Sequence, residues 1–353
     1  MAPNTKRTTV YAMSLVALTV LAGCSTRSSD AAPAAGAPAH KASSEVKVAL
    51  VPGGPHTYFK AWAPVAQQAK TDFGLGDVKF DETSEWDQAK QNSLVNSLAS
   101  QGYNAFGIFG VSPTDINSTF SDLKAKGASV ASLASCPAGD TNAADFCLST
   151  DVGDAAYKAA KAAIEAMGGQ GKLVHLTGNN VDSNTQRRIA GVKKAVDETG
   201  GKVTVLTTIT DVDKDLQTAQ KAVSDLLSAH GKEINGVVTT AYNPAVAAAD
   251  GVKASGLPIK VIAIDDDPTI LAGIKDGSVA ATITQNPFGQ AYVGAWALGQ
   301  LASGACTMVK PGEIIDSGSF LVTKSNVDTF DGERKAKSDQ LLQQFKTSVL
   351  KCS

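Results

Sequence analysis

The sequence predicts an α/β protein built from two doubly wound lobes, each around a mostly parallel sheet. Short apolar runs rich in β-branched residues, such as 46–51 and 236–240, alternate with stretches of helical spacing, a rhythm typical of βαβ units. This rhythm restarts beyond Asp151 with an Ala-rich helical stretch. The length of 353 residues exceeds the usual size of a single hydrophobic core, which favours two domains.

The first lobe opens with the β-branched strand 46–51, which ends at a Pro-Gly-Gly turn. The next segment is predicted to be a helix with one face on a sheet, because its apolar residues recur three or four positions apart. They are Phe59, Trp62, Ala66, Ala69 and Phe73. Further strands are expected at 78–80, 105–111 and 130–133, with a second helix near 94–98.

The second lobe repeats the alternation. Its strands are expected at 172–176, 203–209, 236–240, 260–264 and 279–283. Helices are expected near 155–167 and 216–227, and in the segments that end near residues 199 and 254. A last helix, 289–302, and an apolar run, 320–322, follow the second unit without strand partners nearby.

Composition and charge exclude some classes of protein. Apolar residues make up 43% of the chain and charged residues 19%, the balance of a globular protein. Lys and Arg number 32 against 34 acidic residues, for a net charge of −2. Nucleic-acid binding would need a basic excess on one face, so we expect no nucleic-acid partner.

The N-terminus indicates export. Lys6 and Arg7 precede an apolar stretch, 10–21, which is too short to span a bilayer and suits a signal peptide. The stretch ends in Leu-Ala-Gly-Cys24, which resembles the bacterial lipobox. The sequence therefore predicts a signal peptide at 1–23 and lipid on Cys24, which would hold the protein on the outer face of the cell membrane. An Ala-, Pro- and Ser-rich tether follows, 24–44.

The four other cysteines are predicted to pair, because an exported protein folds in an oxidising compartment. Cys136 and Cys147 bracket a ten-residue loop, while Cys306 follows a late helix and Cys352 lies near the C-terminus. We expect these two pairs; a free buried thiol at each position is the alternative. No cysteine has a His or Cys at metal or redox spacing, so we expect no metal and no cofactor.

Enzyme motifs are missing from the sequence. There is no Gly-x-Ser-x-Gly elbow, no His-Glu-x-x-His, and only four His residues. The glycines at 168–171 precede a strand, the reverse of a phosphate-binding loop. The Asp run 265–267 could hold a cation, but Asp267 before Pro268 is a natural helix N-cap, which disfavours a metal site there. The sequence therefore predicts a protein that is not an enzyme.

Ligands of doubly wound sheets bind beyond the carboxyl ends of the strands. In this sequence the loops that follow the strands are rich in hydroxyl, amide and carboxylate groups and poor in Lys and Arg. This set suits a neutral ligand with many hydroxyls better than a phosphate. The loops in question are 53–56, 112–115, 135–136, 178–180, 240–243 and 265–267.

Over about residues 45 to 325 the chain resembles the type I periplasmic sugar-binding proteins, most closely the ribose-binding branch. The matching segments are 48–51 with Tyr58 and Phe59, then 112–115, Arg188-x-x-Gly191, Ile264-Asp265 and 281–285. The resemblance implies three hinge crossings between the lobes, near Asp151, Gln285 and Val322. The N-lobe would then comprise 45–150 plus 286–322, and the C-lobe 151–285 plus 323–353.

The resemblance also implies the ligand-binding residues. They are Tyr58, Phe59, Ser112, Asn180, Gln186, Arg187, Tyr242, Asp265 and Gln285. Where ribose binders carry an Asp-Arg pair, this chain has Ala134-Ser135, and their helix-borne Arg falls on Gln186 or Arg187. Their Asn in the loop near 240 aligns with Ala241. These departures disfavour ribose and favour another aldose or an open-chain polyol.

The sequence thus predicts a monomeric binding lipoprotein that delivers a monosaccharide or sugar alcohol to the permease of an ABC transporter. A receptor for a sugar-like signal or chemotaxis ligand would share these features. Asp265 is expected to accept hydrogen bonds from vicinal hydroxyls, which are stronger for being charge-assisted. The two lobes are expected to close around the ligand.

Overall fold

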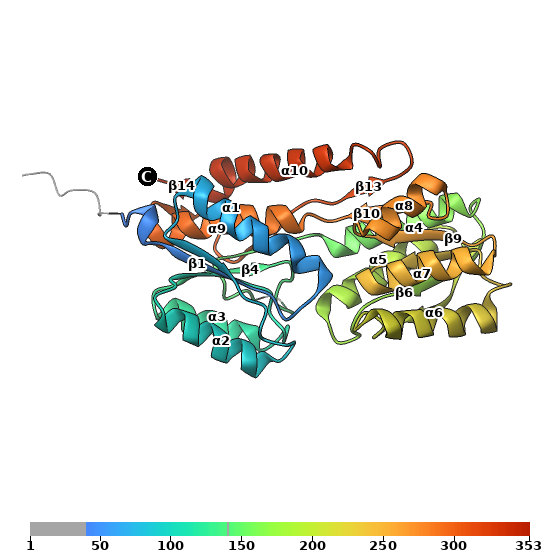
Figure 1. Cartoon of the computed structure of the whole chain (residues 1–353), viewed down its shortest axis with the longest axis horizontal. Helices are drawn as coiled ribbons and strands as arrows, with labels where there is room; N and C mark the ends of the chain where they lie inside the picture. The colour runs from blue at the N-terminus through green and yellow to red at the C-terminus, as the bar shows by residue number, and fades with distance from the viewer. Residues whose placement is uncertain (1–39, 140) are drawn as a thin grey trace, which may run out of the picture. The chain divides into compact units, whose positions relative to one another are not determined.

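Two six-stranded sheets organise the computed structural model, which describes residues 40–139 and 141–353 (Figure 1). The signal peptide, Cys24 and most of the tether predicted from the sequence lie outside the described residues. The first sheet has the strand order β12-β5-β4-β3-β1-β2 and the second β13-β10-β9-β8-β6-β7. These are the two doubly wound lobes that the sequence predicts.

The first sheet is parallel throughout. Val48 of β1 pairs with Val78 of β2 on one side and with Ala105 of β3 on the other. Its strands are β1 (Lys47–Val51), β2 (Asp77–Phe80), β3 (Ala105–Ile108), β4 (Ser129–Leu133), β5 (Phe146–Ser149) and β12 (Glu313–Asp316). Its helices are α1 (Trp62–Phe73), α2 (Gln88–Ser100), α3 (Ile116–Ala125) and α9 (Pro287–Ser303), and a 3-10 turn, Thr57–Ala61, leads into α1.

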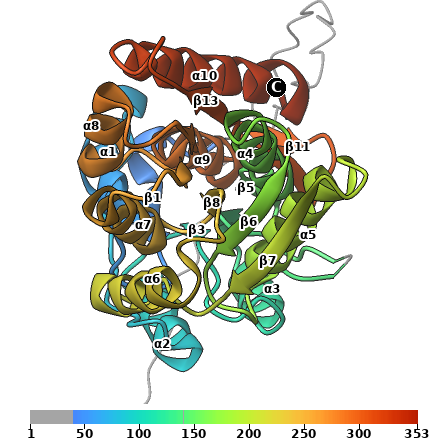
Figure 2. The same cartoon turned by 90° about the vertical axis from the view of Figure 1, so that its right-hand side faces the viewer.

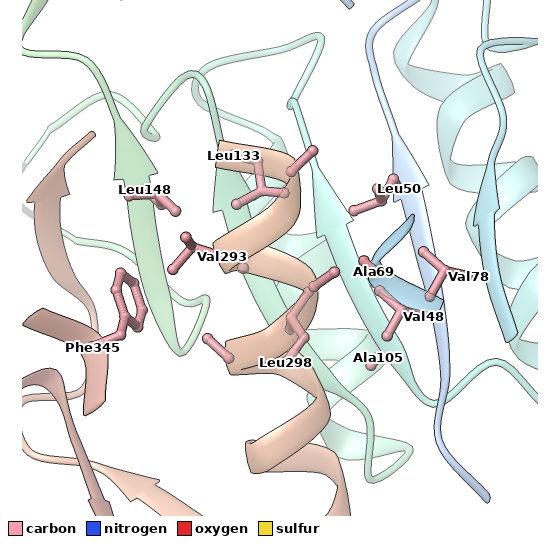
Figure 3. Packing of buried hydrophobic residues seen from close by; sticks show 14 of the residues in the cluster. Val48, Leu50, Ala69, Val78, Ala105, Leu133, Leu148, Val293, Leu298 and Phe345 are labelled. Atoms are coloured by element: carbon pink, nitrogen blue, oxygen red, sulfur yellow. The ribbon is translucent and has the colours of Figure 1, made fainter. Parts of the chain in front are cut away.

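Side chains of the first sheet alternate between two cores. Val48 and Leu50 of β1 pack with α1 and α9, whereas Ala49 and Val51 pack with α2 and α3, as the two-residue period of a strand requires. Figure 3 shows the first of these cores, with Val293 and Leu298 of α9 over the sheet. Helices therefore cover both faces, and the loops at the carboxyl ends of the strands are left to form a site.

The second sheet is parallel except at its edge, where β13 runs antiparallel to β10. Its strands are β6 (Gly171–Leu176), β7 (Val203–Ile209), β8 (Gly236–Thr239), β9 (Lys260–Ile264), β10 (Ala281–Thr284) and β13 (Phe320–Val322). Its helices are α4 (Val152–Ala166), α5 (Ser183–Asp197), α6 (Leu216–His230), α7 (Tyr242–Ser255) and α8 (Pro268–Asp276). Figure 2 shows α4 and α5 on one side of this sheet and α6, α7 and α8 on the other.

The C-terminal part of the chain differs from the expectation. The run 320–322 was expected in the first lobe, but β13 lies in the second sheet, where Val322 pairs with Thr282. The third crossing is therefore the segment between β12 and β13. Crossings near Asp151 and Gln285 lie where the sequence places them, between β5 and α4 and between β10 and α9.

The tail 323–353 was expected to pack on the second lobe, and only its beginning does so. Phe330, at the start of α10 (Phe330–Gln344), is in a second-lobe core, whereas Leu341 and Phe345 are in a first-lobe core. The last strand, β14 (Leu350–Cys352), pairs with β11 (Cys306–Met308) beside α9. Because these apolar residues are buried in the first lobe, α10 runs from the second lobe to the first and is a fourth link between them (Figure 1).

Two disulfides join the cysteine pairs expected from the sequence. Cys136–Cys147 closes the loop between β4 and β5, with a Cα–Cα distance of 5.6 Å. Cys306–Cys352 joins β11 to β14, where the two residues are register partners. Within 40–139 and 141–353, no helix is long and apolar enough to cross a membrane.

Candidate binding site

A cavity of about 560 Å³ lies between the lobes and is lined by the loops at the carboxyl ends of both sheets. The first lobe contributes His56, Tyr58, Phe59, Trp86, Phe109 and Ala134, among others. The second lobe contributes polar groups that include Asp182, Arg188, Asp213, Tyr242 and Asp265, and Gln285 comes from the crossing. A groove of about 610 Å³ between α5 and β7 is lined by the second lobe alone. Of these two, the cavity between the lobes is the one that lies where doubly wound sheets bind ligands.

Asp265 is the most constrained residue of the cavity wall. It follows β9 directly, has a positive φ of 62°, and is only 6% exposed. Its N–H donates to the carbonyl of Ile283 at 2.8 Å, and Gln285 Nε2 donates to its Oδ1 at 2.9 Å. Burial raises the pKa of Asp265 to about 7, although the hydrogen bond from Gln285 opposes this rise. The fold thus fixes a carboxylate at the cavity with further lone pairs for ligand hydroxyls.

Arg188 supplies the complementary donor. It lines the cavity, and in the described part of the chain its Nε is buried without a hydrogen-bond partner. Burial raises the pKa of Asp265, and the positive charge of Arg188 opposes that rise, so the two groups interact electrostatically. Gly191, one turn later, lets α5 approach α4, because a Cβ there would lie 2.2 Å from the Gly153 carbonyl oxygen. The Arg-x-x-Gly motif therefore directs one residue to the cavity and the other to helix packing.

Tyr58 connects the cavity to the crossing segments. Its hydroxyl donates to Gln290 Oε1 at 2.8 Å, and Gln290 Nε2 donates to Ser317 Oγ at 2.9 Å. Gln290 lies on α9 and Ser317 directly after β12, each next to a point where the chain changes lobe. Burial raises the pKa of Tyr58, so the phenol remains protonated and keeps its donor. Hydrogen bonds therefore connect this wall of the cavity to the segments that cross between the lobes.

His56 and Asp213 link the lobes across the cavity. The Tyr58 N–H donates to His56 Nδ1 at 3.1 Å, so the proton of the neutral ring is on Nε2. That Nε2 lies 3.5 Å from Asp213 Oδ2 in the second lobe. The Tyr242 ring lies beside His56, 6.0 Å between centroids, and its hydroxyl donates to Asp267 Oδ2 at 2.7 Å. Both lobes thus meet directly at this side of the cavity.

The structure brings five of the nine expected ligand-binding residues into the cavity wall. These are Tyr58, Phe59, Tyr242, Asp265 and Gln285; their binding role stays a prediction. Ser112, Asn180, Gln186 and Arg187 are not among the lining residues.

The four expected residues that do not line the cavity either bond to neighbours in the sequence or lie on a face of α5 that points away from it. Ser112 Oγ donates to Asp115 within its own loop, and Gln186 Nε2 donates to the Asn180 carbonyl. On α5, Asn184 and Arg188 lie one turn apart and both face the cavity, which directs Gln186 and Arg187 away from it. The helical period was the signal that could have identified Arg188. His56 lies in the loop 53–56 that was expected to face the ligand, but neither His56 nor Trp86 was among the nine expected ligand-binding residues.

In the described part of the chain, no group of three or more His, Cys, Asp or Glu side chains is placed to hold a metal ion. The potential ligands of the cavity are partly engaged elsewhere. Asp265, for example, accepts from Gln285 Nε2 at 2.9 Å, and nearby Asp267, which does not line the cavity, accepts from Thr269 N–H at 2.7 Å as the N-cap of α8. The groups that remain for a ligand are a carboxylate, a guanidinium, amides and aromatic rings.

Comparison with known proteins agrees with this architecture. A family model described as "Periplasmic binding protein domain" matches residues 48–306. No curated protein matches the chain in sequence.

Solved structures show the same fold at low identity. One is an ABC transporter solute-binding protein from Burkholderia graminis C4D1M in complex with D-arabinose: it is 22% identical, with a TM-score of 0.72 over 82% of this chain and 99% of that chain. Another, from Actinobacillus succinogenes 130z with bound D-allose, is 19% identical, with a TM-score of 0.71 over 80% and 99%. A third, from Bacillus halodurans C-125 with bound myo-inositol, is 17% identical, with a TM-score of 0.72 over 83% and 99%. Because the family model covers most of the chain, this protein belongs to the periplasmic binding proteins, a family of non-enzymatic solute-binding proteins.

Proposed function

We propose that this protein is the substrate-binding lipoprotein of an ABC transporter, which captures a monosaccharide or sugar alcohol and delivers it to the permease. The observation that carries the proposal is the placement of Asp265 and Gln285 opposite Tyr58 in a cavity lined by both lobes. A carboxylate and an amide held this way can accept from and donate to neighbouring hydroxyls. The structural neighbours bound to D-arabinose, D-allose and myo-inositol support this ligand class.

A thermal-shift screen against monosaccharides, alditols and cyclitols tests the proposal. A ligand that binds the folded form and not the unfolded chain raises the midpoint of unfolding as its concentration increases. We expect at least one compound to raise the midpoint in a dose-dependent way, with D-arabinose, D-allose and myo-inositol as the first probes. If no compound shifts the midpoint at millimolar concentration, the proposed ligand class is wrong.

Membrane attachment through Cys24 is the second part of the proposal, and it depends on the sequence Leu-Ala-Gly-Cys24. Cys24→Ala should either release the processed protein from membranes or leave the precursor uncut, because lipid on this sulfur would be the anchor. Cell fractionation followed by mass spectrometry of the N-terminus measures both outcomes. Mature wild-type protein that carries no lipid would contradict the anchor.

A further inference from the structure

The three consecutive aspartates that follow β9 have three different partners. Asp265 lines the cavity and accepts from Gln285. Asp267 is the N-cap of α8. Asp266 is not among the residues that line the cavity, and its Oδ2 accepts from Arg334 Nη1 of α10 at 2.5 Å. The loop that carries Asp265 is therefore in contact with the C-terminal tail of the chain.

Arg334 is held in place by two neighbours on its own helix. Its Nη2 donates to Asp331 Oδ1 at 2.6 Å, and its guanidinium lies over the Phe330 ring, 5.6 Å from the centroid. Phe330 is itself buried in a core of the second lobe. A planar guanidinium that is already ordered loses little further freedom when it binds a carboxylate. Arg334 therefore presents a pre-ordered donor to Asp266.

The same face of α10 also contacts the residue that follows Gln285. Ser338 lies one turn after Arg334, so the two side chains share a face of the helix. Ser338 is 3% exposed, and its Oγ donates to Asn286 Oδ1 at 3.0 Å. Asn286 is also the N-cap of α9. One face of α10 thus holds the residue that follows each member of the hydrogen-bonded pair Asp265 and Gln285.

The backbone of Asp265 depends on its neighbours, because a φ of 62° lies in the left-handed region. A non-glycine residue adopts this conformation only where the surrounding structure imposes it. The Asp265 N–H donates to the Ile283 carbonyl, and Thr282 Oγ1 donates to the Asp265 carbonyl at 2.7 Å. Strand β10 therefore holds the backbone of Asp265, while Arg334 of α10 holds the side chain of the next residue.

We propose that Arg334 is a positioning residue of the binding site: through Asp266 it fixes the direction in which Asp265 presents its carboxylate to ligand hydroxyls. This inference rests on the proposed function, which assigns ligand hydroxyls to Asp265. A partly exposed ion pair adds little to the stability of the fold. The hydrogen bonds of a charged acceptor, however, weaken when their distance or angle departs from the optimum. Loss of Arg334 should therefore reduce ligand affinity while the protein stays folded.

A double-mutant cycle on the purified full chain tests this role. Calorimetric titration uses the tightest binder among D-arabinose, D-allose and myo-inositol. Arg334→Met, which keeps an unbranched side chain and removes the charge, should weaken binding about fivefold, the order of coupling within one hydrogen-bond network. In the Asp265→Ala background it should change affinity less than about twofold, because no carboxylate remains to be positioned. Lys335→Met, which breaks an ion pair with Asp339 within α10, controls for the lost charge and should bind like the wild type.

Amide hydrogen exchange of the same variants is a second readout that needs no ligand. The Asp265 N–H should exchange faster in Arg334→Met than in Lys335→Met or the wild type, because the loop opens more often. Unchanged exchange overturns the positioning role, as does an equal loss of affinity with and without the Asp265 side chain. In either case a sugar that binds the wild type leaves the proposed function standing. If none of the three compounds binds the wild type, the proposed function fails, and the exchange rate alone decides whether Arg334 holds the loop.

Discussion

Replacing Asp265 with Ala is expected to weaken ligand binding about ten- to a hundredfold. The hydroxyls that the carboxylate holds would lose a charged acceptor, which is worth about 1.5 to 3 kcal/mol. Calorimetric titration with the compound selected by the thermal-shift screen measures the change. Wild-type affinity in the Ala variant would remove Asp265 from the binding site.

Asp265→Asn is the matched control, because it keeps the size of the side chain and removes the charge. Burial raises the pKa of Asp265 to about 7, so the fraction of charged carboxylate grows between pH 6 and pH 8. Wild-type affinity should therefore rise over this range, and the affinity of the Asn variant should not. Because the pKa of Asp265 is higher in the folded protein than its ordinary value of 3.8, the fold loses stability as pH rises from 3.8 toward 7. At pH 8 the Asn variant should consequently be at least as stable as the wild type.

Replacing Phe345 with Ala is expected to lower the free energy of unfolding by about 3 to 5 kcal/mol, the usual cost of removing a buried aromatic ring. Phe345 follows α10, is 0% exposed, and lies in the first-lobe core (Figure 3). Its ring centroid lies 5.3 Å from that of Phe146. Denaturation in urea measures the loss. Gln343→Ala, at an exposed position of α10, is the control and should change stability little.

An equal effect of Phe345→Ala and Gln343→Ala would contradict the docking of the tail on the first lobe.

The docking of the tail on the first lobe was not predictable from the sequence. The apolar residues of the tail are few, and nothing in their spacing says which lobe they cover. β14 and β11 pair although they are far apart in the sequence, and the disulfide between Cys306 and Cys352 joins the same two strands.

The regular part of the fold could be predicted, because burial on two faces leaves continuous apolar runs in parallel strands. The runs at 46–51 and 260–264 became β1 and β9 within a residue. Four strands were not identified as such: β5, β11, β12 and β14. They have three or four residues each, and β12 has an Asp and a Glu at its ends. Short strands with polar ends resemble loops unless their partners are known.

The candidate site, like the fold, has residues that the sequence predicts and residues that it does not. Asp265 and Gln285 could be expected from the sequence because each follows a strand, and the ends of strands are fixed by the topology. Identifying Arg188 required knowledge of which face of α5 lines the cavity. Trp86 was not among the expected ligand-binding residues, because its position depends on a positive φ of 58° and on close approach to Gly53 and Gly54. Local strain of this kind is imposed by tertiary contacts and leaves little trace in the sequence.

The central claim is that the ligand is held by residues of both lobes and that the lobes close upon it. His56 of the first lobe lies 3.5 Å from Asp213 of the second, so the structure has the two lobes in direct contact. Entry of a ligand into the cavity between them requires that they separate, and binding should shift the population toward the closed form. Small-angle X-ray scattering, with and without a saturating ligand from the thermal-shift screen, measures this directly. We expect a smaller radius of gyration for the saturated protein, and an unchanged radius on saturation would contradict closure of the lobes.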